Sequence, residues 1–131
     1  MKKVGIKTLN IQQMVSEIDT LLRVTDFLGS ENINLKNRLS QVIQNDLAVG
    51  MLEQIETYQN SFITFDTILA LLVRDIKEHK KRILIDSATE SDLSDKTIHI
   101  QNKLRDDVGK TEKEFAGLRA NFNKFLMNIF D

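Results

Sequence analysis

The stretch IQQMVSEIDTLLRVTDFLGSENINLKNRLSQV (residues 11–42) decides the fold, because its apolar residues recur at alternating spacings of three and four. This spacing is the heptad repeat of helices that pack along one seam. A second seam covers residues 51–83 in a shifted phase, and a third covers residues 97–129. Since a reset of phase marks a break between helices, the three seams predict three long helices.

The three seams have the following members. The first contains Ile11, Met14, Ile18, Leu21, Thr25, Leu28, Asn32, Leu35, Leu39 and Val42; the second contains Met51, Ile55, Tyr58, Phe62, Phe65, Leu69, Leu72, Ile76, His79 and Ile83; the third contains Thr97, Gln101, Leu104, Val108, Thr111, Phe115, Leu118, Phe122, Phe125 and Ile129. Nowhere does a polar/apolar alternation persist, so no sheet is expected.

The predicted helices cover about residues 10–44, 47–84 and 91–129, after a flexible basic tail over residues 1–8. Their similar lengths and short connections favour an elongated antiparallel three-helix bundle or coiled coil. The whole chain, residues 1–131, then forms a single all-α domain. In the polar segment DSATESD (86–92), either Ser87 with Glu90 or Ser91 is expected to cap the third helix.

Two alternatives stay open at this point. The chain has no proline, and the first seam passes Gly29 without a change of phase, so one helix is favoured over a split into two. Asn32 between seam leucines also fits a parallel two-stranded zipper. Val15, Leu22 and Ile43 widen the apolar face beyond one seam, which favours packing against two helices of the same chain.

Polar residues gather near the middle of the predicted bundle. Buried polar groups in helical seams can fix register, and a seam asparagine is the best-attested case. The expected turns place Asn32 level with Tyr58, and Thr25 level with Asp66 and Thr111. We therefore interpret a set of five residues as a register-setting polar core: Thr25, Asn32, Tyr58, Asp66 and Thr111.

Composition limits the functional classes. The formal net charge of −1 creates no overall attraction to nucleic acid or anionic lipid, and the absence of cysteine excludes disulfides and thiolate metal sites. The longest apolar run is far shorter than a membrane span, and residues 1–9 lack the apolar segment of a signal peptide. A soluble, cytoplasmic protein without membrane contact is expected.

No pattern of catalytic residues stands out. Asp75 and His79 lie four residues apart and could share one helix face, but two histidines in the chain are too few for a carboxylate-bridged metal site. His79 is instead interpreted as a partly wet seam residue paired with Asp75. Glycine-rich phosphate loops and nucleophile motifs are missing. We expect no enzyme activity, metal, cofactor or small-molecule substrate.

The strongest charge cluster predicts a contact surface. A basic end of the bundle is expected, formed by Lys2, Lys3, Lys7, Arg74, Lys77, Lys80, Lys81 and Arg82. The sequence thus favours a non-catalytic helical interaction module, such as an adaptor, scaffold or assembly subunit, that binds a protein partner or itself. The alternatives are a nucleic-acid accessory protein that uses the basic end, which lacks the aromatic residues for base stacking, and a parallel coiled-coil scaffold.

Overall fold

Three helices make up the described part of the chain. The computed structural model describes residues 2–44, 50–89 and 94–130, with side chains over 11–44, 50–87 and 94–129. Helix α1 spans Lys2–Gln44, α2 spans Leu52–Thr89 and α3 spans Asp95–Phe130.

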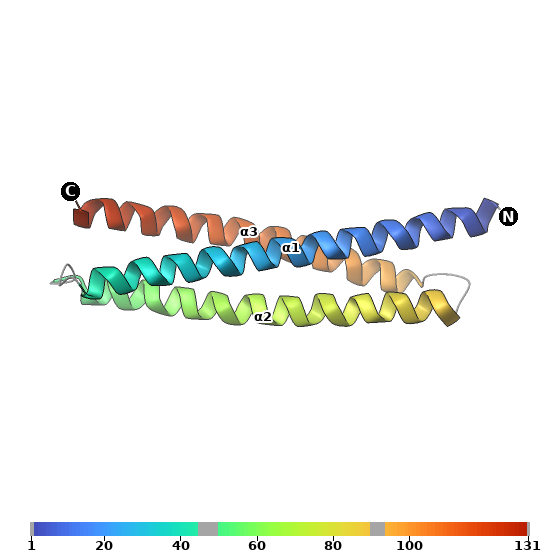
Figure 1. Cartoon of the computed structure of the whole chain (residues 1–131), viewed down its shortest axis with the longest axis horizontal. Helices are drawn as coiled ribbons and strands as arrows, with labels where there is room; N and C mark the ends of the chain where they lie inside the picture. The colour runs from blue at the N-terminus through green and yellow to red at the C-terminus, as the bar shows by residue number, and fades with distance from the viewer. Residues whose placement is uncertain (1, 45–49, 90–93, 131) are drawn as a thin grey trace.

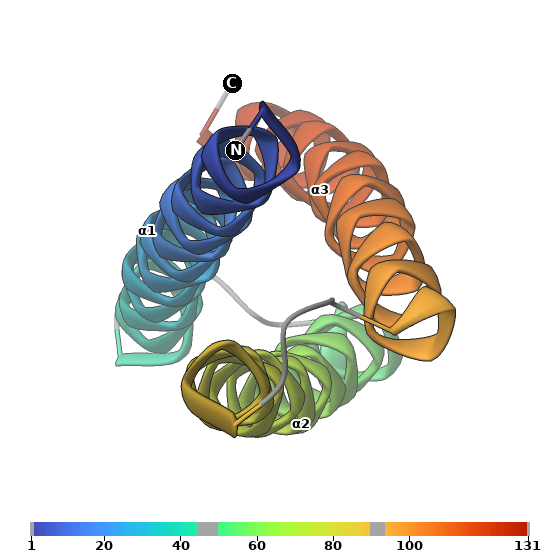
Figure 2. The same ribbon diagram turned by 90° about the vertical axis from the view of Figure 1, so that its right-hand side faces the viewer.

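The helices form an elongated antiparallel bundle. Figure 1 shows α2 running against α1 and α3, with the two termini at opposite ends of the molecule. Viewed along the long axis, the helices occupy the corners of a triangle, and each contacts the other two (Figure 2). The predicted all-α three-helix fold is confirmed.

The core follows the three seams residue by residue. Every side chain classed as buried, from Ile18 at one end to Phe125 at the other, is a seam member. The seam of α1 packs against both α2 and α3, and Asn32 at its centre is fully buried within the chain. Because this seam is used inside the bundle, the parallel zipper that Asn32 also suggested is not the architecture found.

The core divides into two apolar clusters along its length. The cluster near the α1–α2 connection is rich in aromatic residues, and the ring centroids of Phe62 and Phe122 lie 5.0 Å apart in an edge-to-face arrangement. The other cluster is aliphatic and includes Ile18, Ile76 and Val108. Phe115, Phe122 and Phe125 of α3 are therefore core residues, as their seam positions predict.

Helix α1 is longer than expected and unbroken. It begins at Lys2, so the backbone that was predicted as a flexible tail continues the helix. It also passes through Gly29, which makes the four-helix alternative wrong. A Cβ added at Gly29 would meet only Leu69 Cδ1, at 4.0 Å. No neighbour therefore requires glycine at this position. Its presence inside the helix costs about 1 kcal/mol relative to alanine, which the helix tolerates.

Both connections end later in the sequence than predicted. Gly50 has a φ of 83°, and α2 starts two residues beyond it. Helix α2 includes Ser87, whose hydroxyl donates to the Leu84 carbonyl, so this residue does not cap α3. The cap is Ser94, whose Oγ accepts the Thr97 amide at 3.1 Å. Residues 45–49 and 90–93, which hold the predicted turn and Ser91, lie outside the described residues.

These shifts change the level at which side chains meet. The amide of Asn32 reaches Phe62 and Asp66, about one turn beyond the predicted level of Tyr58. The predicted pairing of Thr25 with Asp66 is therefore wrong. Because α2 begins at Leu52, five residues later than predicted, every level counted from the turn moves, although the seams stay unchanged.

Candidate interaction surfaces

The predicted basic end is only partly available for a partner. Lys80 Nζ donates to Asp19 Oδ1 at 2.8 Å, which ties this lysine to α1. Arg74 lies 3.4 Å from the carboxylate of its neighbour Asp75. Lys77, Lys81 and Arg82 are exposed and make no ion pair with any described side chain. These three residues form a local basic patch on α2.

The start of α1 lies at this same end of the bundle. Because Lys80 pairs with Asp19, the end of α2 at Thr89 lies near the level of residue 10. The first turns of α1 thus project beyond α2, as the blue end of the ribbon in Figure 1 shows. The side chains of Lys2, Lys3 and Lys7 lie outside the described residues, and their part in a basic surface stays a prediction.

Asn32 is the best-defined member of the polar core. Its Nδ2 donates to the Phe62 carbonyl at 3.0 Å and to Asp66 Oδ1 at 2.8 Å, and Asp66 also forms an ion pair with Lys36. Asn32 Oδ1 is buried without a partner. Asp66 itself is half-buried at the edge of the bundle. A buried amide that bonds an edge carboxylate links α1 to α2 at one level.

The other predicted polar residues differ in their surroundings. Thr25 and Thr111 are buried, and each hydroxyl donates to a carbonyl of its own helix, from Leu22 and Asp107 respectively. Tyr58 is partly buried and packs on the aromatic cluster. These three residues satisfy or shield their polar groups locally. Within the predicted polar core, Asn32 and Asp66 are thus the pair that forms a hydrogen bond between helices.

A second polar cluster, which the sequence did not predict, connects all three helices near the basic end. Gln101 Nε2 donates to Glu17 Oε1 at 3.0 Å and to the Met14 carbonyl at 3.2 Å. Gln101 Oε1 lies 3.0 Å from His79 Nε2, while Arg105 donates two bonds to Glu17. These bonds from Arg105 hold the pKa of Glu17 below its usual range; Gln101 acts in the same direction, and burial opposes it.

The hydrogen bonds of Gln101 indicate which ring nitrogen of His79 carries a proton. Because the Gln101 amide uses its N–H groups elsewhere, its oxygen must accept, and His79 Nε2 therefore carries the proton. His79 Nδ1 is buried without a partner. Contrary to the prediction, His79 is 1% exposed and does not pair with Asp75. Burial lowers the pKa of His79 below its ordinary value of 6.5, and repulsion from Arg82 adds to this effect, whereas the Gln101 bond and Asp86 oppose it.

Because of the lowered pKa of His79, we expect the stability of the fold to decrease at acidic pH. Since the folded pKa of His79 is lowered, the unfolded chain binds the extra proton first, and the free energy of unfolding decreases as pH falls below about 6.5. We expect a slope of up to about 1.4 kcal/mol per pH unit from this group. Thermal unfolding between about pH 7.5 and pH 5.5 measures it.

Two variants separate His79 from other titrating groups. His79→Leu should lose this part of the pH dependence, and substitution of the exposed His99 by glutamine should keep it. An unchanged slope in His79→Leu would contradict the assignment.

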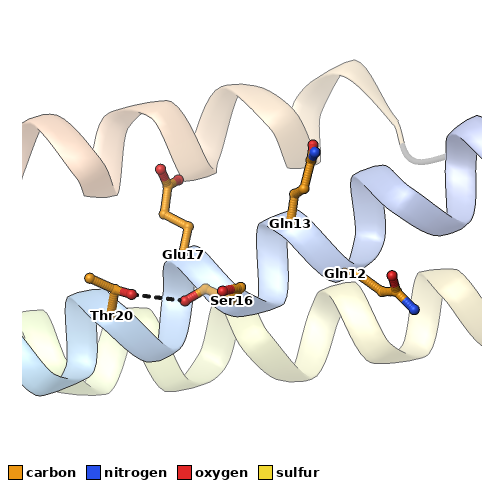
Figure 3. Close-up of a pocket in the computed structure, with 5 residues that line it drawn as sticks. All are labelled: Gln12, Gln13, Ser16, Glu17 and Thr20. Atoms are coloured by element: carbon orange, nitrogen blue, oxygen red, sulfur yellow. Dashed lines mark hydrogen bonds between the residues drawn. The ribbon is translucent and has the colours of Figure 1, made fainter.

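A hollow on α1 does not bring functional groups together. Gln12, Gln13, Ser16, Glu17 and Thr20 line it, all from one helix (Figure 3). Glu17 and Gln13 point toward α3, whereas Gln12 points away from it. Thr20 Oγ1 donates to the Ser16 carbonyl of the same helix. Across the described part of the chain, no group of three histidine or acidic side chains is placed to hold a metal.

The α1–α2 groove, unlike the hollow on α1, is lined by residues of two helices. It has a volume of about 500 Å³, and small or apolar residues of both helices line it, with Asp26 and Asp66 among them. Ile33 on its α1 side is 54% exposed, and Ile63, one heptad before the groove residue Ala70 on α2, is 52% exposed. The small and apolar lining residues of the groove include Gly29, Ser30, Ile33, Leu69, Ala70 and Val73.

This surface lies outside the three seams and was not predicted from the sequence. Ile33 and Ile63 directly follow the seam residues Asn32 and Phe62, so both occupy heptad position b on the side where α1 and α2 meet. The sequence signal for Ile33 and Ile63 is an apolar residue at heptad position b or e of neighbouring helices. Val24 and Ile100, which also lie off the seams, instead pack partly against the core.

Comparisons with known proteins add no assignment. The chain matches no protein-family model, and no similar protein was found among curated proteins or solved structures. None of the helices, over the residues that can be described, has an apolar stretch sufficient to cross a membrane.

Proposed function

We propose that this chain is a non-catalytic helical module that acts by protein–protein contact, as an adaptor, scaffold or assembly subunit. One observation carries the proposal: Ile33 lines the α1–α2 groove and stays exposed, as does Ile63 one heptad before the groove residue Ala70, although the seams already fill the core. Apolar residues that gather on a surface, with polar groups at their edge, are typical of an interaction site. Cytoplasmic location belongs to the same proposal.

The shape of the groove suits a helix. Gly29, Ser30 and Ala70 are small, so a partner backbone can approach closely, and Ile33 and Val73 supply apolar contact. An amphipathic helix that lays its apolar face into such a groove is a common mode of recognition. The groove thus replaces the basic end as the main proposed contact.

The nucleic-acid alternative has less support. Lys80 is paired with Asp19, and the acidic residues Asp75 and Glu78 interrupt the basic patch near the end of α2. Binding to nucleic acid that weakens steeply with salt and is lost when Lys77 and Lys81 are reversed would favour that alternative.

Photo-crosslinking tests the proposed function. A benzophenone amino acid replaces Ser30 at the groove, or Lys113 on the exposed face of α3 as the matched control. We expect protein adducts from position 30 that disappear when Ile33→Glu is added, because a charge on the groove opposes apolar docking. Unfolding temperature must stay unchanged in Ile33→Glu. Adducts that form equally from position 113, or that persist with Ile33→Glu, would refute the groove as the contact.

A further inference from the structure

One exposed strip of α2 has charges of opposite sign at its two ends. Glu53 and Glu56 lie near its start, and Lys77 and Lys81 lie near its end. All four side chains are exposed, and none forms an ion pair with a described residue. By contrast, Lys80 is already paired within the chain. The α2 strip therefore has unpaired charge at both ends.

Between these charges the α2 strip is nearly uncharged. Its middle runs from Asn60 through Ile63, Thr67 and Ala70 to Arg74, and every one of these side chains is exposed. Steps of three and four keep successive members on one helix face. This face borders the α1–α2 groove, to which Ala70 belongs.

The α2 strip is complementary to itself when it is reversed. Counted outward from Thr67, Ile63 corresponds to Ala70, and Asn60 corresponds to Arg74. The next steps match acid with base, Glu56 with Lys77 and Glu53 with Lys81. An antiparallel pair of identical helices centred on Thr67 would thus place every acid opposite a lysine. A parallel pair would place like charges together.

We propose that a second copy of this chain is the occupant of the α1–α2 groove, bound through antiparallel pairing of the two α2 strips about a two-fold axis at Thr67. This inference rests on the proposed interaction function and names its partner. A two-fold interface is isologous, so each charge pair occurs twice. The small residues Gly29 and Ala70 let α2 of the second copy approach the groove.

Charge reversal tests the pairing. Glu56→Lys and Lys77→Glu should each weaken the dimer about tenfold or more in sedimentation equilibrium, because each change creates two repulsive contacts. Combining them should restore the dissociation constant to within about threefold. The exposed Glu112→Lys and Lys113→Glu on α3 are matched controls and should have little effect. A double variant as weak as the single variants would overturn the proposal.

Thiol trapping tests whether the two α2 helices pair in antiparallel or parallel orientation. The chain has no cysteine, so Thr67→Cys introduces the only thiol. Residue 67 faces its own copy at the axis, and we expect rapid oxidation to a disulfide-linked dimer. Glu56→Cys should oxidise slowly, because two copies of position 56 would lie about 33 Å apart along antiparallel helices. Equally fast trapping at position 56 would indicate a parallel pair and overturn the proposal.

The two proposals fail in different ways. A chain that stays monomeric at all concentrations, but still shows Ile33-dependent adducts with another protein, overturns self-association and supports the interaction module. A monomeric chain without such adducts overturns both. A dimer that neither single variant, Glu56→Lys or Lys77→Glu, weakens overturns the α2 pairing alone.

Discussion

Phe122→Ala is expected to lower the free energy of unfolding by about 3–5 kcal/mol, because it removes a fully buried ring from the aromatic cluster. Phe122 is fully buried, and its ring lies between those of Tyr58, Phe62 and Phe125 at centroid distances of 5.2, 5.0 and 6.2 Å. Truncation removes apolar area and leaves a cavity that rigid neighbouring rings fill poorly. Denaturant unfolding measures the loss.

Phe27→Ala is the matched control. Phe27 is 59% exposed on α1, so the same chemical change should shift the unfolding free energy by no more than about 0.5 kcal/mol. Similar losses in the two variants would show that the aromatic cluster is not the packed core described above.

Asn32→Asp is expected to destabilise the fold by about 3 kcal/mol or more at neutral pH. The change keeps the shape of the side chain but replaces an N–H donor by a carboxylate oxygen facing Asp66, which lies 2.8 Å from Nδ2. It also removes the bond to the Phe62 carbonyl. The new carboxylate is costly because burial removes its solvation, and it faces the negative charge of Asp66 without a cation of its own.

The pH dependence of this variant separates charge from shape. Burial and repulsion should raise the pKa of the new carboxyl group in the folded state, so its destabilising effect decreases as pH falls toward about 4.5. Asn37→Asp, on the exposed face of α1, is the matched control and should change stability by no more than about 0.5 kcal/mol. A pH-independent loss in Asn32→Asp would contradict the placement beside Asp66.

Heptad spacing predicted which residues are buried, but it predicted their levels poorly. A seam repeats every turn, so Leu28 and Leu35 are assigned to the core without knowledge of where the helix ends. Levels depend on the turns, and these were set by local choices that the sequence leaves ambiguous. Ser87, Ser91 and Ser94 all have the chemistry of a cap, and the structure uses Ser94.

The functional surfaces were harder to predict because they depend on pairs of helices. Lys80 looks like a free cation in the sequence, and only the level of Asp19 on α1 shows that it is paired. His79 looks like a wet seam residue until Gln101 is placed opposite it. The α1–α2 groove likewise needs Ile33 and Ile63 to be assigned to the same side of the bundle. Periodicity within one helix does not supply these relations.

The central claim is that one chain seals its own core and leaves the α1–α2 face for a partner. Far-ultraviolet circular dichroism and molar mass, measured together over a dilution series, test it most directly. We expect dilution to yield a 15.1 kDa monomer whose helical signal is unchanged. A helical signal that falls as the mass falls would contradict the claim, because the core would then be shared between chains.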